Sequence, residues 1–386
     1  MAREKSDRQS QKRFRSLRTS FLLFFLLLST VLGIMHQFVL VSRPVSVDAL
    51  DPFGAVESAL SVLVSGKLLN YIAWSSFILM LATLIAALLF RRVFCGKVCA
   101  FGALQELAAR VGKLIFRKRF TLPAVIDKPA RYLKYVMLIL IVVMSFATAS
   151  LFIRPYDPWA AYHHIFSVDL FPGFLVGLIL LVVSLAGSLL YDRFFCKYLC
   201  PMGGFLGLIS PAGWFRIKRN DETCTHCMAC NKACPVNIPV ESLTQIKTAE
   251  CINCNLCVAS CPVKETLVIE GPRKGRVSPS AVLWVTVAIF VATLGITTAT
   301  GSFEWTVKSL QQATEEKGSF DPAQIKGTDT FKQISELSGI PKAEFLAQFK
   351  ISEKDFEGPV REVADRAGST FNTAAVRDFV ANRMKK

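Results

Sequence analysis

Five long apolar stretches, separated by polar segments, dominate the pattern of this chain. A helix needs about 20 consecutive apolar residues to cross the hydrocarbon core of a bilayer, and each stretch reaches that length. We therefore predict five transmembrane helices, over residues 20–41, 69–90, 132–152, 172–191 and 280–300. The first apolar run is longer than the roughly 7–15 residues of a signal-peptide core, and no A-x-A cleavage site follows it. We expect it to be retained.

Basic side chains are distributed unevenly between the connecting loops. The first nineteen residues carry seven lysines and arginines and residues 91–131 carry ten, whereas the two loops on the opposite side carry three. Because basic loops stay in the cytoplasm, we predict a cytoplasmic N-terminus and a cytoplasmic segment at residues 192–278. Residues 301–386 are then extracytoplasmic, in a multi-pass protein of a bacterial inner (cytoplasmic) membrane.

The net charge of +16 lies within the first three hundred residues, since residues 301–386 hold thirteen acidic and thirteen basic side chains. Basic charge that alternates with apolar stretches is typical of membrane topology rather than of nucleic-acid binding. A hydrophobic content of 52% fits the same class. We therefore expect membrane lipid around this chain and no nucleic-acid partner.

Eight of the twelve cysteines form two runs of the pattern C-x₂-C-x₂-C-x₃-C-P, the ligand pattern of bacterial ferredoxins. Zinc sites use isolated C-x₂-C pairs without this run and its proline. In the ferredoxin pattern the fourth cysteine of each run ligates the cluster of the other run. The predicted ligands of two [4Fe–4S] clusters are Cys224, Cys227, Cys230 and Cys261 for the first, and Cys251, Cys254, Cys257 and Cys234 for the second. We expect His226 to tune hydrogen bonding around a cluster rather than to bind iron.

The remaining four cysteines lie in an internal repeat. Residues 88–99 and 189–200 match at an offset of 101 residues, and a D-P-aromatic turn precedes each copy, at residues 51–53 and 157–159. Each copy ends in a C-x₃-C pair, Cys95 with Cys99 and Cys196 with Cys200. We predict two parallel pseudo-repeats, each with a helix, an outer loop, a second helix and a cysteine pair at the cytoplasmic end.

Three roles for the C-x₃-C pairs stay open. Spacing i, i+4 places both cysteines of a pair on one helix face if the helix continues that far. Two such pairs form a four-thiolate site for a third cluster or another bound metal, which relays electrons between the ferredoxin and the membrane. The pairs are otherwise a redox-active dithiol, or small residues that pack the helix ends.

The outer side holds three of the four histidines, His36, His163 and His164. Histidines on facing spans can ligate haem, and one histidine can accept a proton from quinol. Interfacial polar residues are the simpler interpretation. A quinol site near Asp51, Arg154, Asp157 and His163 is a further hypothesis, because quinol oxidation needs proton acceptors.

The C-terminal segment reads as a small soluble module of three or four helices. Phe331, Ile334 and Leu337 lie at helical spacing, Gly339 is expected to end that helix, and Pro341 to open the next. We expect a docking module, a lid over the outer loops, or a small folded appendage.

The resulting fold class is an all-α integral membrane protein with an α+β ferredoxin-like insert for two [4Fe–4S] clusters. Its expected parts are a basic cytoplasmic N-terminus, four spans in two repeats, a cytoplasmic segment, a fifth span and an extracytoplasmic helical module. Their bounds are 1–19, 20–191, 192–278 (with the dicluster ferredoxin at about 216–272), 279–300 and 301–386.

Spans that end in F-C-x₃-C, D-P-aromatic outer turns and a double ferredoxin insert resemble the membrane polyferredoxins of the NapH, NosR and CcoG type. The resemblance covers about residues 20–300. It implies that the chain relays electrons between a quinol pool, or another cytoplasmic donor, and a redox partner. It also implies that Cys95, Cys99, Cys196 and Cys200 are relay cysteines. One branch of this family reduces copper during oxidase assembly.

The leading hypothesis is an electron-carrier subunit of a respiratory system. It would connect cytoplasmic [4Fe–4S] clusters with a quinone pool, or with a membrane or periplasmic acceptor. The alternatives are a copper reductase that acts as an assembly factor for a respiratory oxidase, and a structural anchor that recruits soluble ferredoxin partners.

Overall fold

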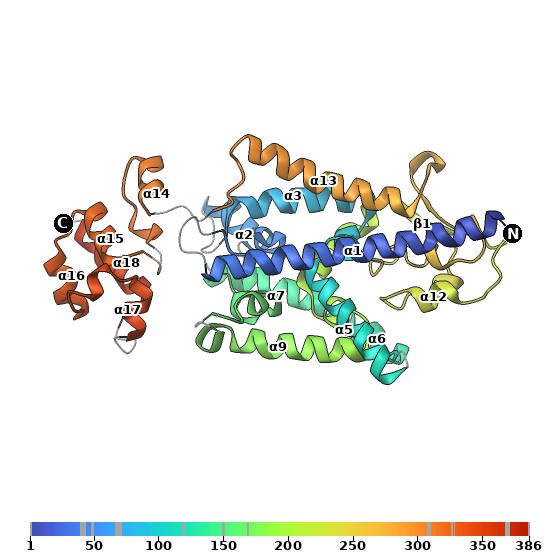
Figure 1. Cartoon of the computed structure of the whole chain (residues 1–386), viewed down its shortest axis with the longest axis horizontal. Coiled ribbons are helices and arrows are strands. Elements are labelled where there is room, and N and C mark those ends of the chain that lie inside the picture. The colour runs from blue at the N-terminus through green and yellow to red at the C-terminus, as the bar shows by residue number, and fades with distance from the viewer. Residues whose placement is uncertain are drawn as a thin grey trace. The chain divides into compact units, whose positions relative to one another are not determined.

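The structure is a computed structural model of the whole chain. The residues that it describes are 2–38, 44–47, 50–65, 72–117, 120–148, 151–167, 170–306, 310–325, 327, 329–366 and 371–384. The chain divides into two compact units, residues 1–305 and residues 306–386 (Figure 1).

Four helical segments of the described chain are long and apolar enough to cross a membrane. They are Gln9–Phe38, Ala124–Thr148, Gly173–Leu190 and Pro279–Ala299. They belong to α1 (Ala2–Phe38), to α6 (Ala124–Ala130) with α7 (Leu133–Thr148), to α9 (Leu170–Leu190) and to α13 (Pro279–Ala299). The prediction of a membrane protein with several helices long enough to cross a membrane is therefore confirmed.

The predicted span at residues 69–90 contains a shorter helix. α3 (Trp74–Phe90) has 17 residues, which is about 25 Å at 1.5 Å per residue, against a hydrocarbon core of about 30 Å. Residues 69–71 of that prediction lie outside the described residues. α2 (Pro52–Ser65) is a further short apolar helix. The count of five spans therefore stays a prediction.

The outward faces of the long helices are apolar. Leu27 on α1, Ile139 on α7, Val182 on α9 and Val291 on α13 are each more than half exposed. Large apolar side chains that face outward along several helices are what a lipid environment requires, because a water-exposed surface of this kind would aggregate. The helical unit is therefore built to be surrounded by lipid.

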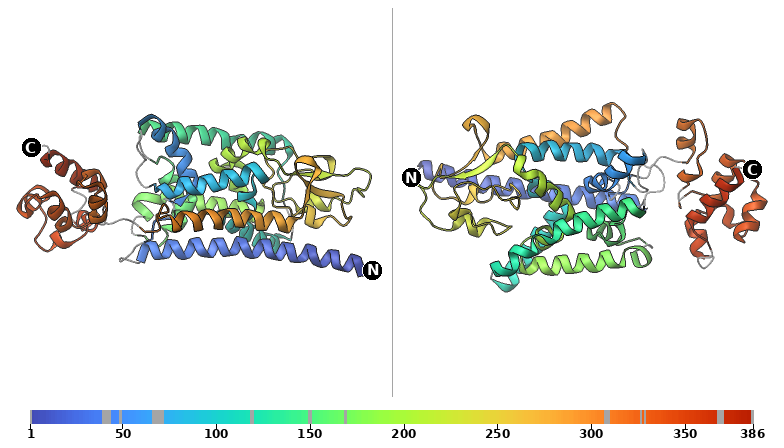
Figure 2. Two further views of the ribbon diagram at one scale, coloured as in Figure 1. Left: turned by 90° about the horizontal axis from the view of Figure 1, so that it is seen from above. Right: turned by 180° about the vertical axis from the view of Figure 1, so that it is seen from behind.

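The ferredoxin-like segment lies at the end of the helical unit at which α1 begins. Figures 1 and 2 show α1, α3, α9 and α13 extending side by side away from this end. α1 is long enough to reach it: Gln11 Nε2 donates to the Cys261 carbonyl at 2.9 Å, and Arg15 Nη2 donates to the Ala259 carbonyl at 2.8 Å. Phe14 packs on Ala259 in the same contact. The first turns of α1 thus hold the second cysteine run.

The ferredoxin-like segment contains a three-stranded antiparallel sheet in the order β1-β2-β3. Its strands are β1 (Arg216–Arg219), β2 (Leu267–Glu270) and β3 (Arg276–Val277). Ile217 pairs with Ile269, and both side chains are buried. The short helix α12 (Ala229–Ala233) lies between β1 and β2 along the chain. The strands hold the two ends of the cysteine-bearing stretch next to each other.

The remaining helices of this unit are short or pack across the long ones. They are α4 (Val93–Lys97), α5 (Ala100–Phe116), α8 (Pro158–His163), α10 (Phe194–Tyr198) and α11 (Pro201–Ile209). α5 packs directly on α9, because Gly112 has no side chain and lies against the backbone of Leu189. This close contact brings the two cysteine-bearing regions together.

The C-terminal unit contains five helices in its described part. They are α14 (Leu310–Lys317), α15 (Phe331–Ser338), α16 (Lys342–Phe349), α17 (Val360–Arg366) and α18 (Thr373–Met384). Gly339 ends α15 in a left-handed conformation, as predicted, and Thr330 and Gln333 form a capping box at its start. Pro341 immediately precedes α16. The sequence predicts three or four helices; α14 is additional, and Leu310 is its single large apolar side chain.

Candidate iron–sulfur centres

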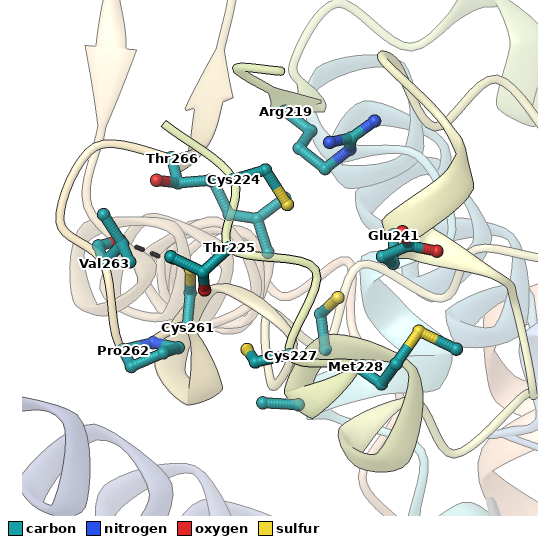
Figure 3. Close-up of a pocket in the computed structure, with 13 residues that line it drawn as sticks. Arg219, Cys224, Thr225, Cys227, Met228, Glu241, Cys261, Pro262, Val263 and Thr266 are labelled. Atoms are coloured by element: carbon teal, nitrogen blue, oxygen red, sulfur yellow. Dashed lines mark hydrogen bonds between the residues drawn. The ribbon is translucent and has the colours of Figure 1, made fainter. Parts of the chain in front are cut away.

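The eight ferredoxin cysteines form two groups that differ in exposure. Cys224, Cys227, Cys230 and Cys261, the predicted ligands of the first cluster, line one pocket together with Arg219 and Glu241 (Figure 3). Cys227 is exposed, Cys224 and Cys261 are partly exposed, and Cys230 is buried. This pocket is therefore the half of the ferredoxin-like segment that a soluble partner can approach.

The predicted ligands of the second cluster are all buried. They are Cys234, Cys251, Cys254 and Cys257. Their thiols lie within electrostatic reach of one another. Burial raises the pKa of Cys234 to about 12, whereas the backbone N–H of Ala229 lowers the pKa of the exposed Cys227. Metal binding would release the thiol protons in both places.

The backbone around both cysteine runs has the form that an iron–sulfur cluster requires. The residues two and four positions after the first cysteine of each run have positive φ: His226 and Met228 in the first run, Asn253 and Asn255 in the second. Alternation of left-handed and ordinary residues directs successive N–H groups into one concavity, which binds anions such as an iron–sulfur centre. Asparagine tolerates this conformation better than most residues. The two loops therefore fit the predicted clusters.

The cysteine side chains themselves are less closely gathered than the backbone of the two loops would suggest. Within the described ranges, no group of three or more cysteine, histidine or acidic side chains is gathered tightly enough to hold a metal ion as it stands. The ligand assignments rest on the ferredoxin spacing, on the shared pocket of the first set and on the burial of the second.

His226 lies beside the exposed set. Its Nδ1 atom is 2.5 Å from Glu241 Oε1, and its side chain is 63% exposed. Glu241 lines the same pocket. The His226 ring is therefore held by the Glu241 carboxylate. This contact agrees with a role in hydrogen bonding near the cluster rather than in iron ligation.

The buried set is docked on the segment that carries the first C-x₃-C pair. Asn253 Nδ2 donates to the Phe90 carbonyl at 2.6 Å. An added Cβ at Gly96 would overlap the Ile252 carbonyl and lie 3.1 Å from the Cα and N atoms of Cys254. Gly96 directly follows Cys95, so the second cysteine run and the first C-x₃-C pair are in backbone contact.

Two adjacent arginines strengthen this docking. Arg91 donates to the carbonyls of Lys247 and Thr248 at 2.9 and 2.7 Å and also to that of Ile246, and Arg92 Nη1 donates to the Ala249 carbonyl at 3.0 Å. Both side chains are almost completely buried. Sequence reasoning counted these residues only as topology signals. The repeated basic position just before F-C was the available clue to a specific role.

The two cysteines of each C-x₃-C pair do not share one helix. Cys95 lies in α4 and Cys99 caps the start of α5, while Cys196 lies in α10 and Cys200 caps the start of α11. The helix does not continue that far, so the condition for one shared helix face is not met. Positive φ values at Arg91 and Arg193 interrupt the helix before each C-x₃-C motif. Cys99 and Cys200 then cap the start of a new helix at the end of each motif.

All four of these thiols nevertheless lie within electrostatic reach of one another. Cys99 and Cys200 each accept the N–H of the residue three positions later, at 3.3 Å. Gln105 Nε2 donates to Cys196 Sγ at 3.2 Å. Burial raises the pKa of Cys99, Cys196 and Cys200.

The residues of the hypothetical quinol site have local structural contacts. Asp51 accepts the Phe53 N–H at 3.2 Å, and Asp157 accepts the Trp159 N–H at 3.0 Å, so both aspartates cap short helices. His163 is buried with its ring 4.5 Å from that of Trp159. Arg154 lies over the ring of Phe174 at 5.3 Å.

The other outer histidines are also held by neighbours. His164 stacks on Phe174 at 4.3 Å, and His36 Nδ1 lies 2.7 Å from the Pro44 carbonyl. Sequence reasoning missed Glu57 on α2, which is 1% exposed and accepts the Ser145 hydroxyl at 2.5 Å. Glu57 stands six positions after Asp51, as His163 stands six after Asp157, so the internal repeat could have drawn attention to it.

Comparison with known proteins agrees with this picture. Residues 72–123 and 174–220 match the family model described as a 4Fe-4S binding domain. Residues 216–262 match the model described as a 4Fe-4S dicluster domain. The first two segments contain the C-x₃-C pairs, and the last contains all eight ferredoxin cysteines. No solved structure matches the chain.

Three relatives illustrate the range of similarity. YccM of Escherichia coli K12 is 33% identical over 233 residues, which is 60% of this chain and 65% of that protein. The protein MJ0750 of Methanocaldococcus jannaschii is 34% identical over 181 residues, 46% of this chain and 71% of that protein. The ferredoxin-type protein NapH of Escherichia coli K12 is 28% identical over 225 residues, 56% of this chain and 73% of that protein. The chain thus covers slightly less than two thirds of YccM.

Apolar helices, a docked ferredoxin-like segment and two full ligand runs define an iron–sulfur electron-transfer protein of the membrane. The family-model matches cover parts of the helical unit as well as both cysteine runs. The chain belongs to the NapH/NosR-type family of membrane polyferredoxins.

Proposed function

We propose that this chain relays electrons between a cytoplasmic redox partner and a quinone pool, or an acceptor in the membrane or periplasm. The observation that carries the proposal is the graded exposure of the cysteine sets. The first set opens to solvent, the second is buried, and the second is in backbone contact with the first C-x₃-C pair through Gly96. Iron–sulfur clusters, when bound, supply one-electron redox chemistry.

The residues of the chain have three roles in this proposal: they bind the clusters, position the second cysteine run and shield it from solvent. The exposed set and Glu241 offer a partner a route of access. The N-terminal turns of α1 cover the second cysteine run through Gln11 and Arg15. Arg91, Arg92 and Asn253 hold that run against the membrane helices. A fixed, dry arrangement favours electron transfer within the chain over loss to solvent oxidants.

The proposed topology completes this account. The N-terminus and the ferredoxin-like segment are cytoplasmic, four spans form two parallel pseudo-repeats, a fifth span follows the ferredoxin-like segment, and the C-terminal unit is extracytoplasmic. The basic loops support this orientation. The paired breaks before α4 and α10, each followed by a cysteine-capped helix, support the repeat. The C-terminal unit is then a docking module or a small folded appendage.

A copper reductase is the second candidate, because thiolates are the ligands that Cu(I) prefers and four thiols gather beside the ferredoxin-like segment. Dithionite-reduced protein in lipid nanodiscs distinguishes the two functions. We expect a quinone analogue to re-oxidise the clusters, so that the absorbance of the oxidised clusters returns. Cu²⁺ bound at the chain should leave the absorbance unchanged on the same timescale. Re-oxidation by Cu²⁺ alone would contradict electron relay to quinone and support the assembly function.

The same assay tests the structural-anchor alternative. Cys95→Ala and Cys196→Ala are expected to slow re-oxidation by the quinone analogue. Ser29→Ala provides a control, since its hydroxyl donates to the Leu26 carbonyl of its own helix. Unchanged electron flow in both cysteine variants would favour an anchor.

A further inference from the structure

Buried positive charge accumulates where the ferredoxin-like segment meets the C-x₃-C motifs. Seven lysines and arginines of the described chain are less than 2% exposed: Arg18, Arg91, Arg92, Lys97, Lys134, Arg193 and Lys197. Two carboxylates form ion pairs with four of them, Glu106 with Arg18 and Arg193, and Glu250 with Arg92 and Lys134. Arg91 and Lys97 donate to backbone carbonyls instead. Fully buried charge without an equal opposite charge is costly, so this region is built around negative groups.

Arg92 and Arg193 occupy equivalent positions of the internal repeat, three residues before Cys95 and Cys196. Each reaches the cysteine loop of the other copy. Arg193 donates to the Cys95 carbonyl, and its Nη1 would lie 2.7 Å from a Cβ added at Gly102. Arg92 Nη2 would lie 2.8 Å from a Cβ added at Gly203. The two guanidinium groups therefore cross over and flank all four thiols.

Two helix N-termini point at the same place. Cys99 caps α5, which has 17 residues, and Cys200 caps α11, which has nine. Helix N-termini carry partial positive charge and stabilise thiolate. Among the described residues, Arg92 Nε is buried without a hydrogen-bond partner, and the Arg92 guanidinium lies within electrostatic reach of Cys95, Cys196 and Cys200.

We propose that Cys95, Cys99, Cys196 and Cys200 bind a third [4Fe–4S] cluster, and that Arg92 and Arg193 compensate its negative charge. Four thiolates around a doubly positive cubane core leave a net dianion, and the excess of positive charge in the Glu106 and Glu250 ion pairs, to which Arg193 and Arg92 belong, compensates it. The four thiol protons pass to water when the cluster binds. The segments that match the 4Fe-4S binding domain contain these four cysteines and none of the ferredoxin eight. The inference deepens the proposed relay and rests on it for its place in electron transfer.

Iron and acid-labile sulfide analysis of anaerobically purified protein tests the ligand set. We expect about twelve irons per chain in the wild type, four for each cubane, and about eight in the Cys95→Ala/Cys196→Ala variant. The wild-type count alone is informative if the variant fails to fold. About eight irons in the wild type, or equal counts in both proteins, would overturn the third cluster, as would zinc bound in its place.

Redox titration monitored by EPR tests the two arginines. Arg92→Gln and Arg193→Gln are expected to shift one spectral component to a more negative midpoint potential, because removal of a nearby positive charge disfavours the reduced cluster. The control Arg276→Gln changes an exposed arginine paired with exposed Glu265, and all potentials should stay unchanged. Wild-type potentials in both arginine variants would contradict the assigned role. If the third cluster is missing, re-oxidation of the two ferredoxin clusters by quinone can still be measured. The third-cluster proposal and the electron-relay proposal can therefore fail independently.

Discussion

Glu106→Gln is expected to destabilise the membrane unit by about 3–5 kcal/mol, the usual cost of removing one partner from a buried ion pair. Arg18 donates to both carboxylate oxygens of Glu106, at 3.0 and 2.7 Å, and Arg193 Nε donates to Oε1 at 2.9 Å. Burial by itself raises the pKa of Glu106, but Arg193 and Arg18 outweigh it and lower the pKa to about 2. Glutamine keeps the shape and removes the charge.

The measurement is thermal unfolding in detergent at neutral pH. Glu270→Gln is the matched control, since Glu270 pairs with Lys218, whose side chain is 41% exposed, and such pairs contribute about 0–1 kcal/mol. Because the pKa of Glu106 is depressed, its contribution is present at neutral pH and is lost as the pH falls toward 2. Equal melting temperatures for the two variants would show that Glu106 does not hold these arginines.

Gly96→Ala is expected to displace the second cysteine run from the first C-x₃-C pair. The added methyl group meets the backbone of Ile252 and Cys254, and backbone cannot rotate away as a side chain can. Overpacking of this kind costs about 1–3 kcal/mol. The variant should therefore melt at a lower temperature, and its reduced clusters should be re-oxidised more slowly by a quinone analogue.

Gly295→Ala is the control for this substitution. Gly295 lies in α13 with nothing within 4 Å of an added Cβ, so alanine there should leave the rate unchanged and raise stability by up to about 1 kcal/mol. If Gly96→Ala matched this control in both rate and stability, the backbone contact would have no role in electron transfer.

The sequence was most informative where spacing alone determines chemistry. The two C-x₂-C-x₂-C-x₃-C-P runs predicted two ligand sets, and the structure places one around a shared pocket and buries the other. Apolar length predicted membrane helices, because a bilayer imposes one simple requirement. α3 shows the limit of that rule: its 17 residues are a helix, but length alone does not establish a span.

The sequence was least informative about side chains whose role depends on distant partners. Arg193 pairs with Glu106 and reaches the Cys95 carbonyl across 98 residues of sequence. Periodicity carries no information about such contacts. The helix breaks before Cys95 and Cys196 were missed for a related reason. Arg91 and Arg193 adopt positive φ, a conformation that tertiary hydrogen bonds impose on residues that would otherwise favour helix.

Chelation of iron from anaerobically purified protein, followed by EPR and acid-labile sulfide analysis, decides whether the eight ferredoxin cysteines hold two cubanes of different exposure. We predict at least about eight irons per chain, four for each ferredoxin cubane. About four of them should leave quickly, from the set that includes exposed Cys227, and the others only as the chain unfolds. Iron-free or zinc-containing protein, or loss of all iron in one phase from folded protein, would contradict the account.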